Sequence, residues 1–342
     1  MGKIRIAILG AGNMGTAMAH ALAGNGHKIR LWDFFQEVVE DISKNRINGR
    51  FLPGIRLHEN IHATADHIEC VTGAELVIVC VPSAFVIPSF TPVIPFLAKN
   101  TVILNAAKGF APGSREPMPV KLATLAPDHP VAHLAGPILA NELARGMAAA
   151  CEIASGKEGT SRRVAEWFDG PSFMPIVTTD VVGAAFGGIL KNIYSILIGY
   201  LGKQSGDSRN LEAATAIACI REMAAISIAC GAEEKTLYGI AGLGDLIATG
   251  FSQSSHNRKF GQMLGNGLSL SELEEQLGWL PEGARSTATV CSLAQEKHIH
   301  APLAGFVQQL LNGEGLSSSD FLGVLRLESS RHGNPNPCHA IP

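Results

Sequence analysis

Short apolar runs recur through the first half of the chain and predict strands that are buried on both faces. The runs are continuous and do not alternate with polar residues, which is typical of a parallel sheet covered by helices on both sides. Helical stretches separate most of them. The pattern predicts an α/β fold with an N-terminal, doubly wound parallel sheet that is built from residues 4–9, 27–33, 76–81, 101–105 and 131–135.

From about residue 181 the apolar positions follow a helical period and strand signals vanish. The stretch at residues 182–201 is apolar nearly all round, which indicates a buried helix. We therefore expect an all-helical C-terminal domain. The predicted boundaries are 1–185 for the sheet domain, 186–330 for the helical domain and 331–342 for a flexible tail with loop chemistry.

Composition narrows the class of protein and of partner. A chain of 342 residues suggests about two domains. The net charge of −3, without a basic stripe, argues against a nucleic-acid partner. The seven cysteines have no metal-ligand spacing, so no metal site is predicted. No uncharged apolar run reaches about 18 residues and no signal-like segment is seen, so we expect no membrane span and a cytoplasmic location.

A glycine-rich turn links the first predicted strand to the helix that follows it. Gly10 suits the tight turn, Gly12 lets the backbone approach a pyrophosphate, and Gly15 lets helix and strand pack closely. The free N–H groups of the helix start would face phosphate oxygens. These residues predict a dinucleotide site in a Rossmann-type domain. A glycine-rich turn without a ligand is the alternative.

Asp33 ends the second predicted strand, 23 positions after Gly10. Dinucleotide-binding folds place near this position the carboxylate that bonds the adenosine ribose hydroxyls. Such a carboxylate repels a 2′-phosphate, which favours NAD as the cofactor and leaves NADP as the second choice. A strand-end Asp that caps the next helix is the other interpretation.

Two lysines are candidates for chemistry. Lys191 lies inside the apolar helical stretch, where an ammonium needs partners, and a lysine that acts as a general base needs a lowered pKa. It could also snorkel to the surface. Lys108 follows a predicted strand at the sheet edge where ligands bind, and Gly136 follows the next strand. A loop lysine at the surface is the alternative for Lys108.

A second polar cluster lies in the helical half. Asp245 is flanked by glycines, and a four-residue segment of hydrogen-bond donors precedes a predicted helix. Donors that converge at a helix start form an anion site. A polar N-capping loop is the alternative. The four donors are Ser255, His256, Asn257 and Arg258.

Taken together, these motifs resemble the bacterial-type NAD(P)-dependent glycerol-3-phosphate dehydrogenases. The resemblance covers the chain from Gly10 to about Ala294 and implies the fold of the 6-phosphogluconate-dehydrogenase type, in which a Rossmann domain precedes an all-helical one. The matching segments are residues 10–17, 81–83, 107–109, 136–137 with Ala140 and Glu142, 190–193, 242–246, 257–258 and 282–283.

The resemblance also implies an activity and the roles of residues. The chain would interconvert sn-glycerol 3-phosphate and dihydroxyacetone phosphate, supply phospholipid synthesis and form a homodimer. Lys191 would accept the proton of the C2 hydroxyl, Lys108 would assist it, and Asp245 would fix the amines. Expected cofactor contacts are Gly10, Gly12, Asn13, Met14, Gly15, Asp33, Lys108, Ala140, His256 and Glu282. Expected contacts to the small phosphorylated substrate are Lys108, Gly136, Lys191, Asp245, Ser255, His256, Asn257 and Arg258.

Three departures from the family pattern fall where specificity is set, and one is that no arginine closely follows residues 81–83. His256 stands where an arginine is usual, and a histidine with an ordinary pKa is mostly neutral at pH 7. Ile138 stands where a small hydroxyl residue is usual. Two alternatives therefore stay open. One is a related dehydrogenase of another small hydroxy acid or phosphorylated polyol, and the other is an inactive cofactor-binding protein.

Overall fold

The chain falls into two compact units in its computed structural model, which describes residues 2–314, 317 and 319–325. The sheet unit comprises Met1–Leu190 and Ser227–Ala248. The helical unit comprises Lys191–Ile226 and Thr249–Pro342.

The two units do not follow the predicted boundary after residue 185. The sheet unit extends to Leu190 and also contains the later segment Ser227–Ala248. Asp245 therefore belongs to the sheet unit, whereas Lys191 is the first residue of the helical unit. The tail predicted for residues 331–342 lies outside the described residues.

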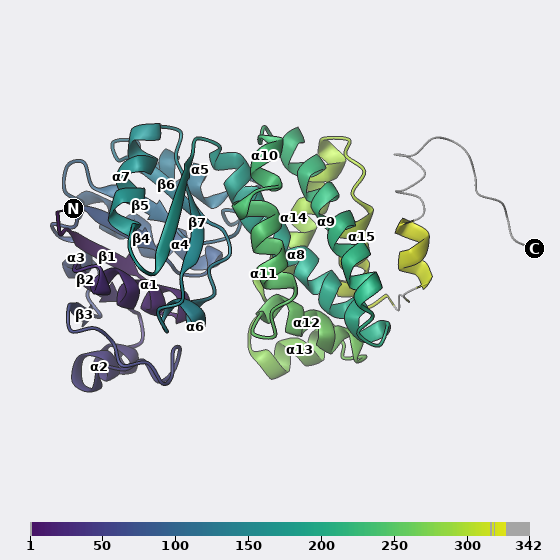
Figure 1. Cartoon of the computed structure of the whole chain (residues 1–342), viewed down its shortest axis with the longest axis horizontal. Coiled ribbons are helices and arrows are strands. Elements are labelled where there is room, and N and C mark those ends of the chain that lie inside the picture. Colours follow the sequence, from purple (N-terminus) through teal and green to yellow (C-terminus); the bar gives the residue numbers. More distant parts are fainter. Residues whose placement is uncertain (1, 315–316, 318, 326–342) are drawn as a thin grey trace, which may run out of the picture. The chain divides into compact units, whose positions relative to one another are not determined.

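The sheet has eight strands in the order β3-β2-β1-β4-β5-β6-β7-β8 (Figure 1). Neighbouring strands run parallel except for β6 and β7, so the prediction of a parallel sheet is corrected at this one pair. The strands are β1 Arg5–Leu9, β2 Lys28–Trp32, β3 Ile61–Thr64, β4 Leu76–Val79, β5 Val102–Asn105, β6 Val131–Ala135, β7 Ala149–Ala154 and β8 Phe173–Thr178.

The five predicted strands are confirmed as β1, β2, β4, β5 and β6, and three others were missed. The missed β3 and β8 are the two edge strands. Pro175 is accommodated in β8, as edge strands allow. The missed β7 consists mostly of small residues and contains the charged Glu152, so its apolar signal is weak. The sequence pattern finds the strands with strongly apolar runs, whatever their length.

Both faces of the sheet are covered, as the continuous apolar runs predict. In β1, Ile6 and Ile8 belong to one buried cluster, whereas Ala7 and Leu9 belong to the cluster on the opposite face. The helical segments of the sheet unit are α1 Asn13–Gly24, α2 Gln36–Asn45, α3 His67–Val71, α4 Ser83–Phe90, η1 Thr91–Phe96, α5 Met118–Leu125, α6 Ala140–Leu143, α7 Glu158–Phe168, α10 Glu234–Leu237 and the π-turn η2 Ile240–Gly244.

The helical unit is built around the second half of α8 Val181–Gln204. Glycines allow backbones to touch there: a Cβ on Gly199 would lie 2.2 Å from the Arg258 carbonyl oxygen, and one on Gly261 would lie 1.9 Å from that of Ile196. Its other helices are α9 Arg209–Ala229, α12 His256–Gly265, α13 Leu270–Leu277, α14 Glu282–Glu296 and α15 Pro302–Leu311, while α11 Asp245–Gly250 begins in the sheet unit.

Among the described residues, α8 is the one helix whose length and composition would allow it to span a membrane. However, 89% of its most apolar window is buried inside the protein. That burial is typical of the core helix of a globular fold and agrees with the prediction of a buried helix.

Candidate functional site

The glycine turn between β1 and α1 has the geometry that a dinucleotide phosphate requires. Gly10 has a φ of 112°, and a Cβ there would lie 2.7 Å from the Cys80 carbonyl oxygen. A Cβ on Gly15 would lie 1.9 Å from the Gly10 carbonyl oxygen. Gly12 precedes α1 and supplies no capping side chain, and no atom would crowd a Cβ there. The turn therefore fits a pyrophosphate at the start of α1.

Side chains that the sequence analysis missed hold this turn in shape. Asn48 is fully buried, and its Nδ2 donates to the Ala11 carbonyl oxygen and to the Thr16 hydroxyl, each at 2.8 Å. The Asn13 amide donates to the Phe51 carbonyl oxygen at 2.7 Å. A lone asparagine far along the chain gives no sequence signal for such a contact.

Asp33 joins the end of β2 to the glycine turn. Its Oδ2 accepts the Ala11 N–H at 2.9 Å, and its Oδ1 accepts the Phe35 N–H at 3.0 Å. Burial raises the pKa of Asp33, and these two N–H groups oppose the rise. The helix that follows has Phe35 as its N-cap, so Asp33 is not the capping residue of the alternative interpretation.

Lys108 and Asp245 form an ion pair inside the sheet unit. The Lys108 Nζ lies 2.5 Å from Asp245 Oδ2 and 3.3 Å from the Gly136 carbonyl oxygen. The Asp245 side chain is 2% exposed and that of Lys108 is 21% exposed. A Cβ on Gly188 would lie 3.3 Å from Lys108 Cγ, so α8 packs against the lysine stem. Two residues that are 137 positions apart are thus fixed together, as the functional interpretation requires.

Glu152 anchors the π-turn that leads to Asp245, and the sequence analysis missed it. Its carboxylate on β7 accepts the backbone N–H groups of Ala241 and Ile240. Burial is the largest cause that raises the pKa of Glu152. The glycines around Asp245 serve the same turn, because a Cβ on Gly242 would lie 2.0 Å from the Leu237 carbonyl oxygen.

A second residue that was missed, His133, lies buried beside the ion pair. Its Nδ1 lies 3.0 Å from the side-chain nitrogen of Asn105, which follows from their pairing across β5 and β6. Burial and the Lys108 ammonium lower the pKa of His133 to about 4. The imidazole is therefore neutral at pH 7 and adds no charge beside Lys108.

Lys191 is buried in α8, at the start of the helical unit. Its side chain is 7% exposed, and its Nζ donates to the Thr249 hydroxyl at 2.7 Å. The snorkelling interpretation is therefore wrong. The Thr249 hydroxyl thus helps to fix the position of the Lys191 amine.

The four donors at the start of α12 do not all converge on one position where an anion could bind. Ser255 is the N-cap, and its hydroxyl accepts the Arg258 N–H at 3.2 Å. Asn257 donates to Asn192 Oδ1 and accepts the Gly283 N–H, each at 3.0 Å. The capping interpretation thus holds for Ser255, and the amide of Asn257 joins α8 to α14.

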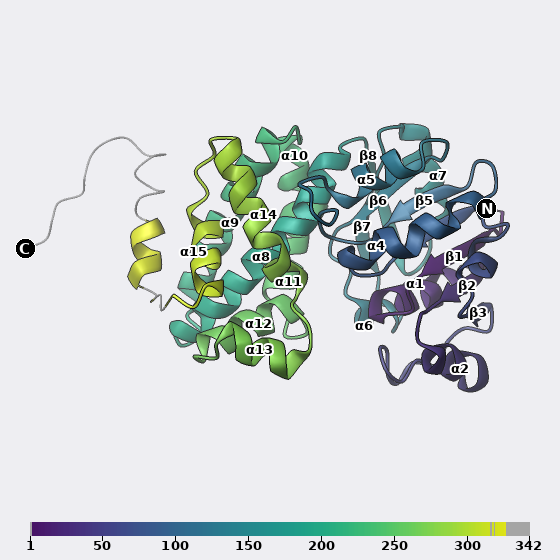
Figure 2. The ribbon, with the colours of Figure 1, turned by 180° about the vertical axis from the view of Figure 1, so that it is seen from behind.

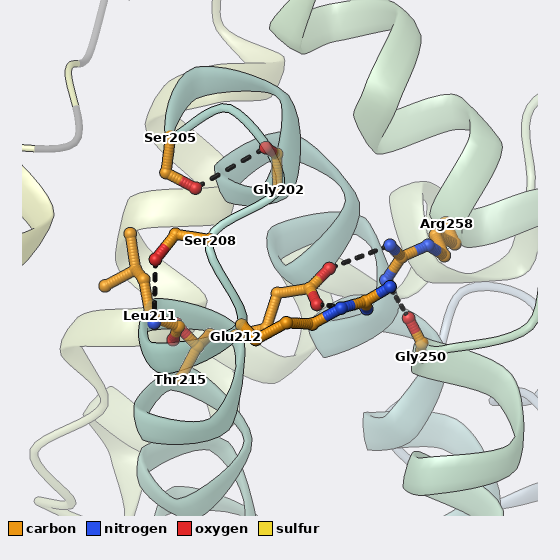
Figure 3. Close-up of polar contacts among 9 residues, drawn as sticks. Gly202, Ser205, Ser208, Leu211, Glu212, Thr215, Gly250 and Arg258 are labelled. Carbon is orange, nitrogen blue, oxygen red and sulfur yellow. Dashed lines mark hydrogen bonds and ion pairs between the residues drawn. The ribbon is translucent and has the colours of Figure 1, made fainter.

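Arg258 is held by protein groups. Its guanidinium donates to Glu212 Oε1 at 2.9 Å and to the Gly250 carbonyl oxygen (Figure 3). Arg258 is 3% exposed and Glu212 is 2% exposed. Arg258 thus helps to position α9, α11 and α12, and its contact with substrate stays a prediction.

His256 differs from its three neighbours, since its ring packs edge-on against Trp279 with the centroids 5.3 Å apart. The residue is exposed overall. Partial burial of the ring and the Lys259 ammonium lower the pKa of His256 below 6.5. At pH 7 the neutral fraction of this imidazole is therefore larger than that of an ordinary histidine.

The remaining predicted site residues lie at helix or strand ends. Gly136 follows β6 with a φ of 110°, and Ala140 begins α6. Met14 lies in the first turn of α1, and Glu282 begins α14 in the helical unit. Within residues 2–314, 317 and 319–325, no group of three or more His, Cys, Asp or Glu side chains could hold a metal ion.

Comparisons with known proteins place the chain in a family. The N-terminal model of NAD-dependent glycerol-3-phosphate dehydrogenase matches residues 5–161, and the C-terminal model matches residues 180–320. A protein of Moorella thermoacetica named glycerol-3-phosphate dehydrogenase (NAD(P)+) is 37% identical, over 90% of this chain and 92% of the relative. One of that name from Citrifermentans bemidjiense is 34% identical over the same shares.

A solved structure agrees with these relatives. The crystal structure of glycerol-3-phosphate dehydrogenase from Coxiella burnetii matches with a TM-score of 0.87 and 32% identity, over 95% of this chain and 99% of that chain. The two family models together match strands β1 to β7 of the sheet and most of the described helical residues. The chain belongs to the NAD-dependent glycerol-3-phosphate dehydrogenase family.

Proposed function

We propose that this chain is an NAD-dependent oxidoreductase that interconverts sn-glycerol 3-phosphate and dihydroxyacetone phosphate. The observation that carries the proposal is the ion pair of Lys108 with Asp245, in the same unit as a glycine turn that fits a dinucleotide. Family membership supplies the substrate.

Lys191 is the proposed proton acceptor for the C2 hydroxyl. In the oxidising direction its neutral amine takes the hydroxyl proton while the C2 hydrogen leaves with its electron pair, so that the C–O bond becomes a carbonyl. A nicotinamide dinucleotide held at the glycine turn would supply the hydride acceptor for this oxidation and the hydride donor for its reverse. The burial of Lys191 supports this role, because desolvation disfavours the charged form of an amine. The Thr249 hydroxyl also fixes the position of its Nζ.

Lys108 is proposed to act as a fixed positive charge. Asp245 and the Gly136 carbonyl orient its ammonium, and Glu152 holds the π-turn from which Asp245 projects. A preorganised cation stabilises the negative charge that develops on the substrate oxygen.

The phosphate of the substrate is proposed to bind at the start of α12. The first N–H groups of a helix attract anions, and His256 is the side chain there that points away from the interior network. Arg258 acts through the position of this helix, since its guanidinium is bound to Glu212.

A substrate panel tests the proposed reaction. Purified protein with NADH and dihydroxyacetone phosphate is expected to lose NADH absorbance, and glycerol 3-phosphate should give the highest kcat/KM among small hydroxy acids and phosphorylated polyols. A higher kcat/KM for a different compound would favour the alternative of a related dehydrogenase, which Ile138 and His256 suggest. Binding of NADH without turnover of any compound would favour the alternative of an inactive cofactor-binding protein.

Replacing Asp33 is expected to change the choice between NAD and NADP. In Asp33→Asn the repulsion of a 2′-phosphate is removed, which is worth about 1–4 kcal/mol at 4 Å depending on the local dielectric. We expect kcat/KM for NADPH relative to NADH to rise about 10-fold or more. Glu37→Gln is the matched control, because Glu37 is a nearby exposed carboxylate that pairs with Arg50. An equal change in both variants would contradict a direct role for Asp33.

Restoring an arginine at position 256 is expected to tighten substrate binding. A charge-assisted bond to phosphate is worth about 1.5–3 kcal/mol, so KM for dihydroxyacetone phosphate should fall by roughly 10- to 150-fold in His256→Arg at pH 7.5. His256→Gln should stay within about 3-fold of the wild type, because the imidazole is neutral there.

The pH dependence of KM checks the same role of His256. Its pKa lies below 6.5, so the cation is present at low pH and is lost as the pH rises through that lowered value. The ratio of KM between His256→Gln and the wild type should be flat from pH 7 to 8 and increase only below about pH 6.5. A ratio that changes between pH 7 and 8 would contradict the lowered pKa.

Family membership supports three finer proposals. We infer that the protein works in the cytoplasm, supplies glycerol 3-phosphate for phospholipid synthesis and forms a homodimer. Light scattering after size-exclusion chromatography tests the last of these, with a mass of about twice the 36.0 kDa of one chain expected.

A further inference from the structure

A basic groove is lined by residues at the amino-terminal ends of β1, β2 and β3. Figure 2 labels these three strands, which form the part of the sheet that ends at β3. Its volume is about 580 Å³. The dinucleotide turn follows the carboxyl end of β1, so the groove lies at the opposite end of the same strands. Its basic lining residues are Arg5, Lys28, Arg30, Arg46 and His62, and Glu59 is its one carboxylate.

The strand register gathers the cations on one face of the sheet. Arg5 pairs with Lys28 across β1 and β2, and Arg30 pairs with His62 across β2 and β3. Paired residues of neighbouring strands share a face, as do residues two apart on one strand. The helix on this face is α3, which has only five residues, and its Cys70 thiol lies against the Arg30 carbonyl oxygen.

Two arginines of the groove are oriented by neutral groups. The Arg30 guanidinium donates to the Glu69 and Thr72 carbonyl oxygens at 2.7 and 2.9 Å. The Arg46 guanidinium donates to the Ile61 carbonyl oxygen at 2.8 Å and also to that of His58. Carbonyl oxygens hold a guanidinium in place without cancelling its charge, so both arginines stay net positive.

The two other full cations of the groove are Arg5 and Lys28. Neither Arg5 nor Lys28 has a side-chain ion pair within the described part of the chain, and both are exposed. Glu75 accepts the backbone N–H of Arg5, and Glu69 pairs with His62 at 3.6 Å. Four full positive charges therefore line one groove of a chain whose net charge is −3.

We propose that the basic groove binds an oligophosphate anion, either free or as the phosphate chain of a nucleotide. Preoriented guanidinium groups bond phosphate oxygens in pairs, and the two unpaired cations add charge to the same anion. The five residues of β1 separate the groove from the glycine turn by about 15 Å at 3.3 Å per residue, so both can be filled together. The proposal does not depend on the proposed reaction.

Calorimetric titration of the full chain with sodium tripolyphosphate, in the presence of saturating NADH, tests the groove. NADH occupies the dinucleotide turn, so the remaining heat reports a separate site. We expect one equivalent to bind, with an affinity that falls as salt is added. Lys28→Gln and Arg5→Gln should each weaken binding about 5-fold or more. Lys297→Gln is the matched control, since it removes one exposed positive charge from the helical unit.

Thermal unfolding of the two groove variants should match the wild type, because neither side chain has an ion-pair partner to lose.

ATP and AMP separate the two sources of the anion. ATP that binds more tightly than tripolyphosphate identifies a nucleotide, and equal affinity identifies the phosphate chain alone; both results support the groove. No binding at about 1 mM tripolyphosphate, AMP that binds as tightly as ATP, or equal weakening in the Lys297 control overturns it.

Discussion

Lys191→Ala is expected to lower kcat by about 10²- to 10⁴-fold while leaving NADH affinity nearly unchanged. General acid and base groups contribute rate factors of this size. The turn that fits the dinucleotide is held by Asn13, Asp33 and Asn48, and this variant leaves all three side chains unchanged. Steady-state kinetics in both directions and a fluorescence titration with NADH measure the two quantities.

A second lysine of α8 provides the control for this prediction. Lys203 lies twelve positions further along the same helix and is exposed, so Lys203→Ala should keep kcat within about 2-fold of the wild type. Unfolding midpoints of both variants show whether the helix is intact. Near-normal turnover by folded Lys191→Ala protein would remove Lys191 from the mechanism.

Arg258→Ala is expected to destabilise the protein by about 3–5 kcal/mol. Removing the buried partner of an ion pair is costly, and here it leaves the buried Glu212 carboxylate on α9 with only the exposed Arg209 as its cationic partner (Figure 3). The loss also frees the Gly250 carbonyl at the end of α11. Urea unfolding followed by circular dichroism measures the effect, and turnover should fall with it because the start of α12 loses its support.

The same carboxylate offers an internal comparison. Arg209 pairs with the other oxygen of Glu212 at 2.7 Å, but its own side chain is 80% exposed. Arg209→Ala should therefore cost only about 0–1 kcal/mol. The double variant Arg258→Met with Glu212→Leu should recover most of the lost stability, because it removes both buried charges. Equal losses for the two arginines would refute the assignment of Arg258 as the buried partner.

The elements with continuous apolar runs could be predicted from the sequence, because burial on both faces leaves a local signal. The same holds for the glycine turn, where Gly10 and Gly15 meet steric demands from their immediate surroundings. Strand β7 could not be predicted this way. Its small residues pack without a strong apolar pattern, and its antiparallel pairing with β6 depends on partners elsewhere in the chain.

The candidate site shows a similar division. Lys108, Lys191 and Asp245 could be singled out because a charge in an apolar or glycine-rich setting is unusual. The roles of Glu152 and Glu212 could not be predicted, since each acts on groups that are dozens of positions away. The donors at residues 255–258 could be recognised as donors, but only the structure tells which acceptors they have. The sequence shows which side chains can form hydrogen bonds, whereas the tertiary fold decides which partners they bond.

The reduction of dihydroxyacetone phosphate by NADH, measured with wild-type protein beside Lys191→Ala, tests the central claim most directly. The account predicts rapid loss of NADH absorbance with the wild type, formation of glycerol 3-phosphate in equal amount, and almost none of either with the variant. Wild-type protein that binds NADH but shows no turnover at saturating substrate would contradict it.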